Sequence, residues 1–154
     1  MPAHEWGWWP NAKLVSSMHR GTDRASSPDV GQPLTERWEF PGRVDQVPRA
    51  RRLVATTLRQ CPAGADAVLL TNELITNAVV HSTSGRNGLF TVTLTHRIAD
   101  LRVEVADQGG PWIPDGAGHT EHGRGLLIVS NLARAWGVTG DDSGRTVWFE
   151  LDCP

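Results

Sequence analysis

The 154-residue chain is predicted to form one α+β domain, a two-layer sandwich with helices on one face of a mixed, largely antiparallel sheet. Three observations predict this class. Five segments alternate apolar and polar residues, as half-buried strands do. Two longer segments carry apolar residues at helical spacing, and a third apolar segment follows a glycine-rich turn. The expected order is therefore β-α-α-β-β-loop-α-β-β, with sequential strands joined as hairpins.

The boundaries of these elements follow from turn residues and from hydrophobic spacing. The expected strands span residues 35–40, 89–97, 101–107, 136–139 and 145–151. The expected helices span residues 44–60, 63–81 and 125–135. The second of these helices is apolar on nearly all sides, which predicts that it is buried on two sides.

Residues 1–33 differ in composition from the rest of the chain. They contain four prolines, two serine pairs and no apolar periodicity, which is typical of a flexible tail. Three tryptophans in this tail either dock on the domain or remain unpacked. Residues 34–152 are predicted to form the folded domain. Within it, residues 108–123 contain four glycines before Gly123 and two prolines, which predicts a mobile loop long enough to act as a lid.

Composition excludes several classes of function. A formal net charge of −2 and a pI of about 6.3 provide no field that would attract nucleic acid or an anionic membrane. The apolar stretches fall far short of the roughly 20 residues of a membrane helix, and the start lacks a secretory signal pattern. We therefore expect a cytoplasmic protein. Cys61 and Cys153 form no metal motif or disulfide framework and are predicted to be reduced thiols.

A polar stripe runs along the apolar second helix. Glu73, Asn77 and His81 are spaced four residues apart, so they lie on one side of the helix. The amide oxygen of Asn77 is a hard ligand suited to Mg²⁺. A carboxylate one turn earlier, at Glu73, is placed to accept a proton from an attacking hydroxyl. Alternatively, the stripe is simply the exposed face of a helix at the sheet edge, and His81 either contacts ligand or packs locally.

Two further segments have residues suited to binding a nucleotide. Asp107 ends a strand, where its carboxylate would accept a hydrogen bond from an exocyclic amino group, and Gly109 leaves room for a flat base. Gly123-Arg124-Gly125 leads directly into a helix whose free N–H groups attract phosphate. Considered alone, the Asp107–Gly109 segment also fits an ordinary turn after a strand. An outward-pointing Arg124 side chain fits the sequence as well as one that contacts phosphate.

In chain order the three segments read E-L-x-x-N-A-x-x-H, D-x-G and G-x-G-L. This arrangement resembles the N, G1 and G2 boxes of the GHKL ATP-binding superfamily, and most closely its single-domain anti-sigma factor serine/threonine kinases. The resemblance covers residues 36–151 and implies a Bergerat-type fold that binds ATP with Mg²⁺. The second glycine of the fuller D-x-G-x-G pattern is replaced by Pro111, so the local loop path differs from the family pattern.

The resemblance also implies a role for each residue. Glu73 would be the catalytic base and Asn77 the Mg²⁺ ligand. Asp107 would bind the adenine amino group, with Gly109 against the base. The remaining nucleotide contacts implied by the resemblance, with Arg124 adding charge, are Gly123, Arg124, Gly125, Leu126 and Thr146.

Three functions fit these residues. The first is a serine/threonine protein kinase that phosphorylates a small antagonist protein and thereby regulates a sigma factor; the resemblance alone supplies these partners, and many members form homodimers. The second is a binding module that holds or releases a sigma factor according to nucleotide occupancy, without turnover. The third is a histidine kinase fragment, which would need a helical hairpin that the proline-rich residues 1–33 are not expected to form. A small α+β domain without nucleotide is the remaining alternative.

Overall fold

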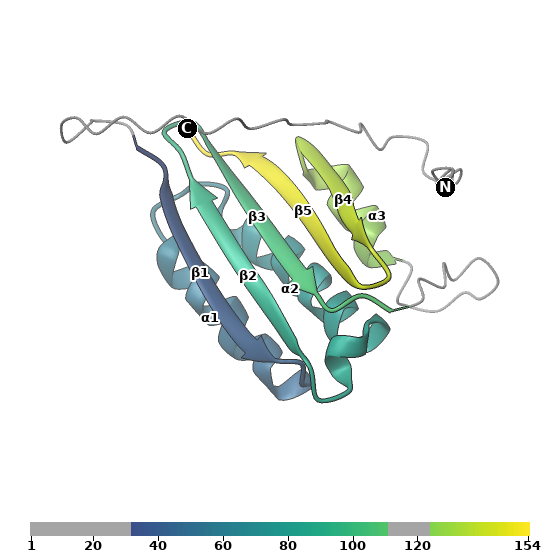
Figure 1. Ribbon diagram of the computed structural model, residues 1–154. Coiled ribbons are helices and arrows are strands. Elements are labelled where there is room, and N and C mark those ends of the chain that lie inside the picture. The colour runs from purple at the N-terminus through teal and green to yellow at the C-terminus, as the bar shows by residue number, and fades with distance from the viewer. Residues whose placement is uncertain (1–31, 111–123) are drawn as a thin grey trace, which may run out of the picture.

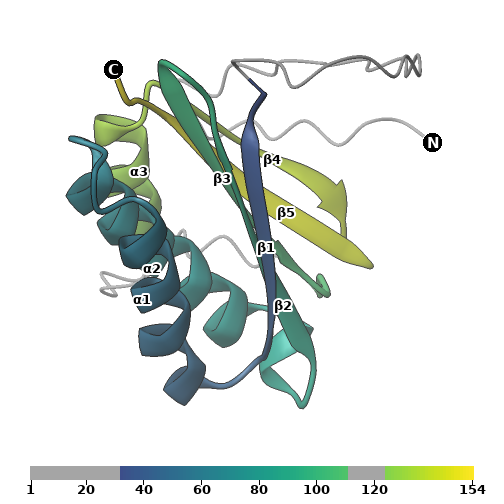
Figure 2. The same cartoon turned by 90° about the vertical axis from the view of Figure 1, so that its left-hand side faces the viewer.

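The computed structural model describes residues 32–110 and 124–154, and for Arg124 the backbone alone. These residues form a five-stranded sheet with the helices packed on one face (Figures 1 and 2). The predicted α+β two-layer sandwich is therefore confirmed. Nearly all of the expected tail, and the expected lid from residue 111 to residue 123, lie outside the described residues.

The strands follow the predicted segments closely. They are β1 (Leu34–Pro41), β2 (Leu89–His96), β3 (Asp100–Asp107), β4 (Ala135–Asp141) and β5 (Gly144–Asp152). Their spatial order is β1-β2-β3-β5-β4, and all four pairings among the described strands are antiparallel. The sheet was expected to be mixed. Because β5 inserts between β3 and β4, these two strands, which run in the same direction, are not neighbours.

The helices also lie where the apolar spacing placed them. They are the single 3₁₀ turns η1 (Val44–Gln46) and η2 (Thr83–Gly85), and the α-helices α1 (Val47–Thr57), α2 (Gly64–His81) and α3 (Arg124–Leu132). The helix expected from residue 44 is divided because Pro48, which has no N–H to donate, stands in the first turn of α1. Among the described helices, none is both long and apolar enough to cross a membrane.

The core lies between α2 and the sheet. Leu70, Leu74 and Ile75 of α2 are at most 1% exposed. They pack in one cluster with the sheet residues Phe90, Val92, Leu94, Leu101, Val103, Val105 and Phe149. Helix α2 also contacts α1 on one side and α3 on the other, as Figure 1 shows. Burial on several sides explains why α2 is apolar on most of its surface.

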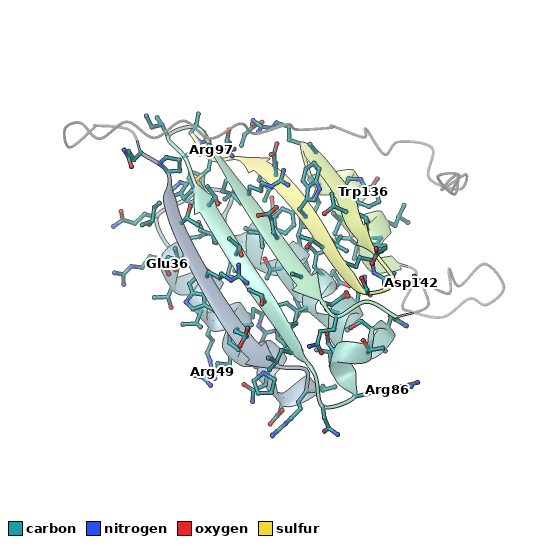
Figure 3. All side chains as sticks on the ribbon, viewed as in Figure 1. Glu36, Arg49, Arg86, Arg97, Trp136 and Asp142 are labelled. Carbon is teal, nitrogen blue, oxygen red and sulfur yellow. A yellow bond between two sulfur atoms is a disulfide. The ribbon has the colours of Figure 1, made fainter. Side chains whose placement is uncertain are left out.

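The opposite face of the sheet carries polar side chains (Figure 3). Trp148 on this face is only 6% exposed, and the guanidinium of Arg102 lies 3.9 Å from the centre of its ring. Arg102 is held there by ion pairs with Glu104 and Glu150. A Cβ atom on Gly137 would lie 2.9 Å from the Trp148 ring, so glycine is required beside the indole. Arg102 and its two glutamate partners thus shield the Trp148 ring on a face that the described helices leave uncovered.

The prediction that both cysteines are reduced thiols is wrong. Cys61 and Cys153 form a disulfide, with their Cα atoms 5.9 Å apart. The two residues are separated by 92 positions, and they meet because the turn between α1 and α2 lies beside the end of β5. Local spacing of cysteines carries no information about such a contact.

We expect Leu70→Ala to lower the free energy of unfolding by about 2–5 kcal/mol, because it leaves a cavity under α2. The neighbouring Leu69 is 42% exposed, so Leu69→Ala is a matched control and should change stability by less than about 0.5 kcal/mol. Urea denaturation of both variants measures the difference. Equal losses would contradict the assignment of α2's buried side.

Candidate functional site

The polar stripe of α2 faces the start of α3. Glu73 and Asn77 are half-buried, whereas His81 is exposed at the end of the helix. A Cβ atom on Gly125 would lie 2.5 Å from Oε2 and 3.4 Å from Cβ of Glu73. Gly125 therefore allows the first turn of α3 to approach the Glu73 side chain closely. Two segments that are separated by about fifty residues in sequence are brought together here.

The start of α3 attracts negative charge. The N–H groups of the first turn of a helix have no partner within the helix, and the helix dipole places a partial positive charge there. Gly125 and Leu126 are buried in this turn. The Glu73 carboxylate lies at the same position, where phosphate groups would also be favoured. Gly123 and the side chain of Arg124 lie outside the described residues.

The end of β3 presents the Asp107 carboxylate. Its Oδ1 accepts a hydrogen bond from the backbone N–H of Gly109 at 2.7 Å. In the sheet Asp107 is paired with Arg145 of β5, which is only 4% exposed. Burial raises the pKa of Asp107 above the usual carboxyl range, and the Gly109 N–H and the charge of Arg145 oppose this rise. The result is a partly desolvated hydrogen-bond acceptor at the end of a strand.

The backbone conformation and close surroundings of Gly109 require glycine at this position. Its φ is +73°, and a Cβ atom would lie 2.3 Å from the carbonyl oxygen of Asp142 in the β4–β5 turn. The next residue, Gly110, donates its N–H to the same oxygen at 2.7 Å. The sequence predicts that Gly109 leaves room for a flat base. The structure adds that Gly109 fits the end of β3 against the β4–β5 turn, the turn that carries Asp142 in Figure 3.

Thr83 and Ser84, which follow α2, hold the end of β3 from the side opposite the β4–β5 turn. The backbone N–H of Thr83 donates to the carbonyl of Gly109 at 2.8 Å, and the Thr83 hydroxyl donates to the carbonyl of Gln108 at 3.0 Å. The hydroxyl of Ser84, which is fully buried, accepts from the N–H of Gln108 at 2.9 Å. The sequence predicts only that a helix ends at this segment. A run of hydroxyl residues directly after the polar stripe was the available signal.

Thr146 is not brought to Asp107. It pairs with Ala106, and strand alternation places it on the face of the sheet opposite to that of the neighbouring Arg145. Arg145 is the β5 residue that lies across from Asp107, and its Nη2 lies 3.5 Å from the carbonyl of Gly110. The sequence motifs do not point to Arg145 as a site residue. A single position along a strand decides which residue faces inward, and the register is not visible in the sequence.

A comparison with protein families identifies the fold around this site. The model of the histidine kinase-like ATPase domain matches residues 40–151, well over half of the chain. The chain belongs to this family. No curated protein matches the chain significantly. The predicted GHKL relationship is thus confirmed, and a domain of this family is an ATP-binding domain.

The residues present suit the ligands that a histidine kinase-like ATPase domain binds. The half-buried Asn77 offers a neutral oxygen, the type of protein ligand that Mg²⁺ accepts alongside water and phosphate. The first turn of α3 offers N–H groups to phosphate, and the partly buried Asp107 offers an acceptor to the adenine amino group. Donors and acceptors for each part of Mg·ATP are therefore available on α2, α3 and β3.

We expect Asp107→Asn to weaken ATP binding by about 10- to 100-fold at neutral pH, because it removes a charged acceptor worth about 1.5–3 kcal/mol. The same change should alter the pH dependence of stability. Because the folded state raises the pKa of Asp107, ionisation destabilises the fold as the pH rises from about 4 to that raised pKa, and this loss then persists. The asparagine variant should lack the loss. Calorimetric ATP titration and urea denaturation at several pH values measure both effects.

Asp142→Asn is the matched control, since Asp142 is exposed on the neighbouring turn and contacts Gly110 through its backbone only. It should bind ATP like the wild type. Equal ATP affinity of the wild type and the Asp107 variant would show that the strand-end carboxylate does not recognise the base.

Proposed function

We propose that this histidine kinase-like ATPase domain is an ATP-dependent serine/threonine protein kinase of the anti-sigma factor type. Its substrate would be a serine or threonine of a small antagonist protein. The observation that carries the proposal is the approach of Gly125 to the Glu73 carboxylate, which puts a proton acceptor at the phosphate-attracting start of α3. A base next to the terminal phosphate is what transfer to a hydroxyl needs.

Each residue of the site would then have one task. Glu73 accepts the proton of the attacking hydroxyl, and Asn77 holds Mg²⁺, which neutralises charge on the phosphates when bound. The first turn of α3, with Gly125 and Leu126, positions the phosphates through its N–H groups. Asp107 orients the nucleotide by accepting from its amino group. Catalysis by such a site depends mainly on positioning and electrostatics rather than on a covalent intermediate.

The proposed partners are a sigma factor, which the protein would hold, and the antagonist, which it would phosphorylate. Both act in the cytoplasm, so the proposal places the protein there. The resemblance in the three boxes supports this choice, and the formal net charge of −2 is consistent with protein rather than nucleic acid as the partner. A homodimer, common among members of the superfamily, forms part of the proposal.

We expect Glu73→Gln to reduce phosphotransfer by about 10²- to 10⁴-fold, because the amide cannot accept the proton. ATP affinity should change by less than about threefold, since the proposed role of Glu73 is in the transfer step. The assay incubates each variant with radiolabelled ATP, Mg²⁺ and small antagonist proteins of the anti-anti-sigma fold from the same organism. Glu39→Gln, an exposed glutamate on β1, is the control and should behave as the wild type.

Phosphate transfer at the wild-type rate by the Glu73 variant would rule out Glu73 as the base. If no antagonist is phosphorylated while a sigma factor is captured only in the presence of ATP, the protein is instead the binding module without turnover. Capture that persists in Asn77→Ala without nucleotide would exclude control by ATP.

We further expect Gly125→Ala to fold normally but to lose phosphotransfer. The new methyl group would meet the movable end of the Glu73 side chain, which can shift at little cost, and alanine is favoured over glycine in helices by about 1 kcal/mol. Glu73 would, however, be displaced from the start of α3. Urea denaturation should show stability within about 1 kcal/mol of the wild type, whereas the kinase assay should show at least about a tenfold loss. Unchanged transfer would contradict the proposed importance of this contact.

A further inference from the structure

A second cluster of chemically reactive side chains lies at the other end of the domain. Cys61, His96 and Cys153 present their ligand atoms within 4.8 Å of one another. His96 ends β2 and Cys153 follows β5, whereas Asp107 and the β4–β5 turn lie at the opposite end of these strands (Figure 1). This cluster is therefore separate from the nucleotide site and plays no part in the proposed phosphotransfer.

The backbone holds the three residues in place independently of the bond between the sulfurs. The N–H of Cys61 donates to the carbonyl of Leu58 at 2.9 Å, and the Cys61 carbonyl accepts from Gly64 at 2.9 Å. The N–H of Cys153 donates to the carbonyl of Ala99 at 2.9 Å. His96 is fixed by its sheet pairing on both sides. Reduction of the disulfide would therefore leave the three side chains directed at one point.

The environment of the cluster suits a bound ion. Cys153 is 3% exposed, and Cys61 and His96 are half-buried, so the site is shielded but keeps some access to solvent. Two thiolates and an imidazole are a preferred ligand set for Zn²⁺, which binds sulfur at about 2.3 Å and nitrogen at about 2.0–2.1 Å. Tetrahedral zinc places two sulfur ligands about 3.8 Å apart, a separation that side-chain rotation gives with the Cα atoms at 5.9 Å.

We propose that Cys61, His96 and Cys153 form a redox-controlled Zn²⁺ site. In the reduced protein the two thiolates and the imidazole bind the ion, and water fills the fourth position. In the oxidised protein the sulfurs are joined as the disulfide and the ion is released. The conversion is thiol–disulfide exchange with a low-molecular-weight disulfide. Two electrons pass from the two thiolate sulfurs to that disulfide, which takes up two protons from water and leaves as two thiols, while Zn²⁺ is released.

The experiment titrates the reduced full-length protein with Co²⁺ and then displaces Co²⁺ with Zn²⁺. Sulfur ligands give a charge-transfer absorption with Co²⁺ that histidines elsewhere in the chain do not produce. We expect one Co²⁺ per chain with this absorption, and its loss on adding Zn²⁺. Treatment with oxidised glutathione should abolish binding and lower the mass by two hydrogen atoms.

Cys61→Ser, Cys153→Ser and His96→Gln should each weaken binding by more than about 100-fold, beyond the effect of losing an outer-sphere partner. His96→Gln retains both cysteines, so it tests the site even if a cysteine variant folds poorly. His81→Gln, at an exposed position on α2, is the matched control and should bind the ion as the wild type does. Absence of the sulfur absorption in the reduced protein, or unchanged binding after oxidation, would overturn the proposal.

Discussion

The arrangement of the whole domain depends on the packing of α2 against the sheet. One side of α2 supplies Leu70, Leu74 and Ile75 to the core, and that burial fixes the rotation of the helix about its axis. With the rotation fixed, Glu73 and Asn77 remain half-buried on the side that faces α3. A rotation that exposed the polar stripe fully would also remove leucine side chains from the core. The stability of the fold and the position of the candidate base are therefore set by the same contact.

The elements of the fold were predictable because their signals are local. Apolar alternation located the strands, helical spacing located α1 and α2, and an apolar segment after a glycine-rich turn located α3, since each pattern arises within a few neighbouring residues. The division of η1 from α1 at Pro48 is also a local effect. Strand order was not accessible. The insertion of β5 between β3 and β4, which makes all described pairings antiparallel, depends on how distant segments pack.

The residues of the candidate site also divide into those that short motifs predict and those that only the folded sheet determines. Glu73, Asp107 and Gly125 were recognisable because each belongs to a short motif, and the structure brings Gly125 to Glu73. Arg145 was missed and Thr146 was chosen, because facing Asp107 depends on a one-residue register between β3 and β5. The contact between Cys61 and Cys153 was missed for a related reason, because 92 residues separate them and only the folded sheet brings them together.

The way in which Gly109 and Gly110 meet the β4–β5 turn restricts how relatives of this domain can vary. Because the Asp142 carbonyl receives the Gly110 N–H and leaves no room for a side chain on Gly109, the length of that turn is tied to the position of Asp107. Insertions in the β4–β5 hairpin would therefore displace the end of β3 that carries Asp107, although the turn follows Asp107 by more than thirty residues. The β2–β3 hairpin, at the other end of the sheet, makes no such contact with Asp107; the carbonyl of Ala99 in its turn receives the N–H of Cys153, so the length of that turn is tied instead to the position of the cysteine pair.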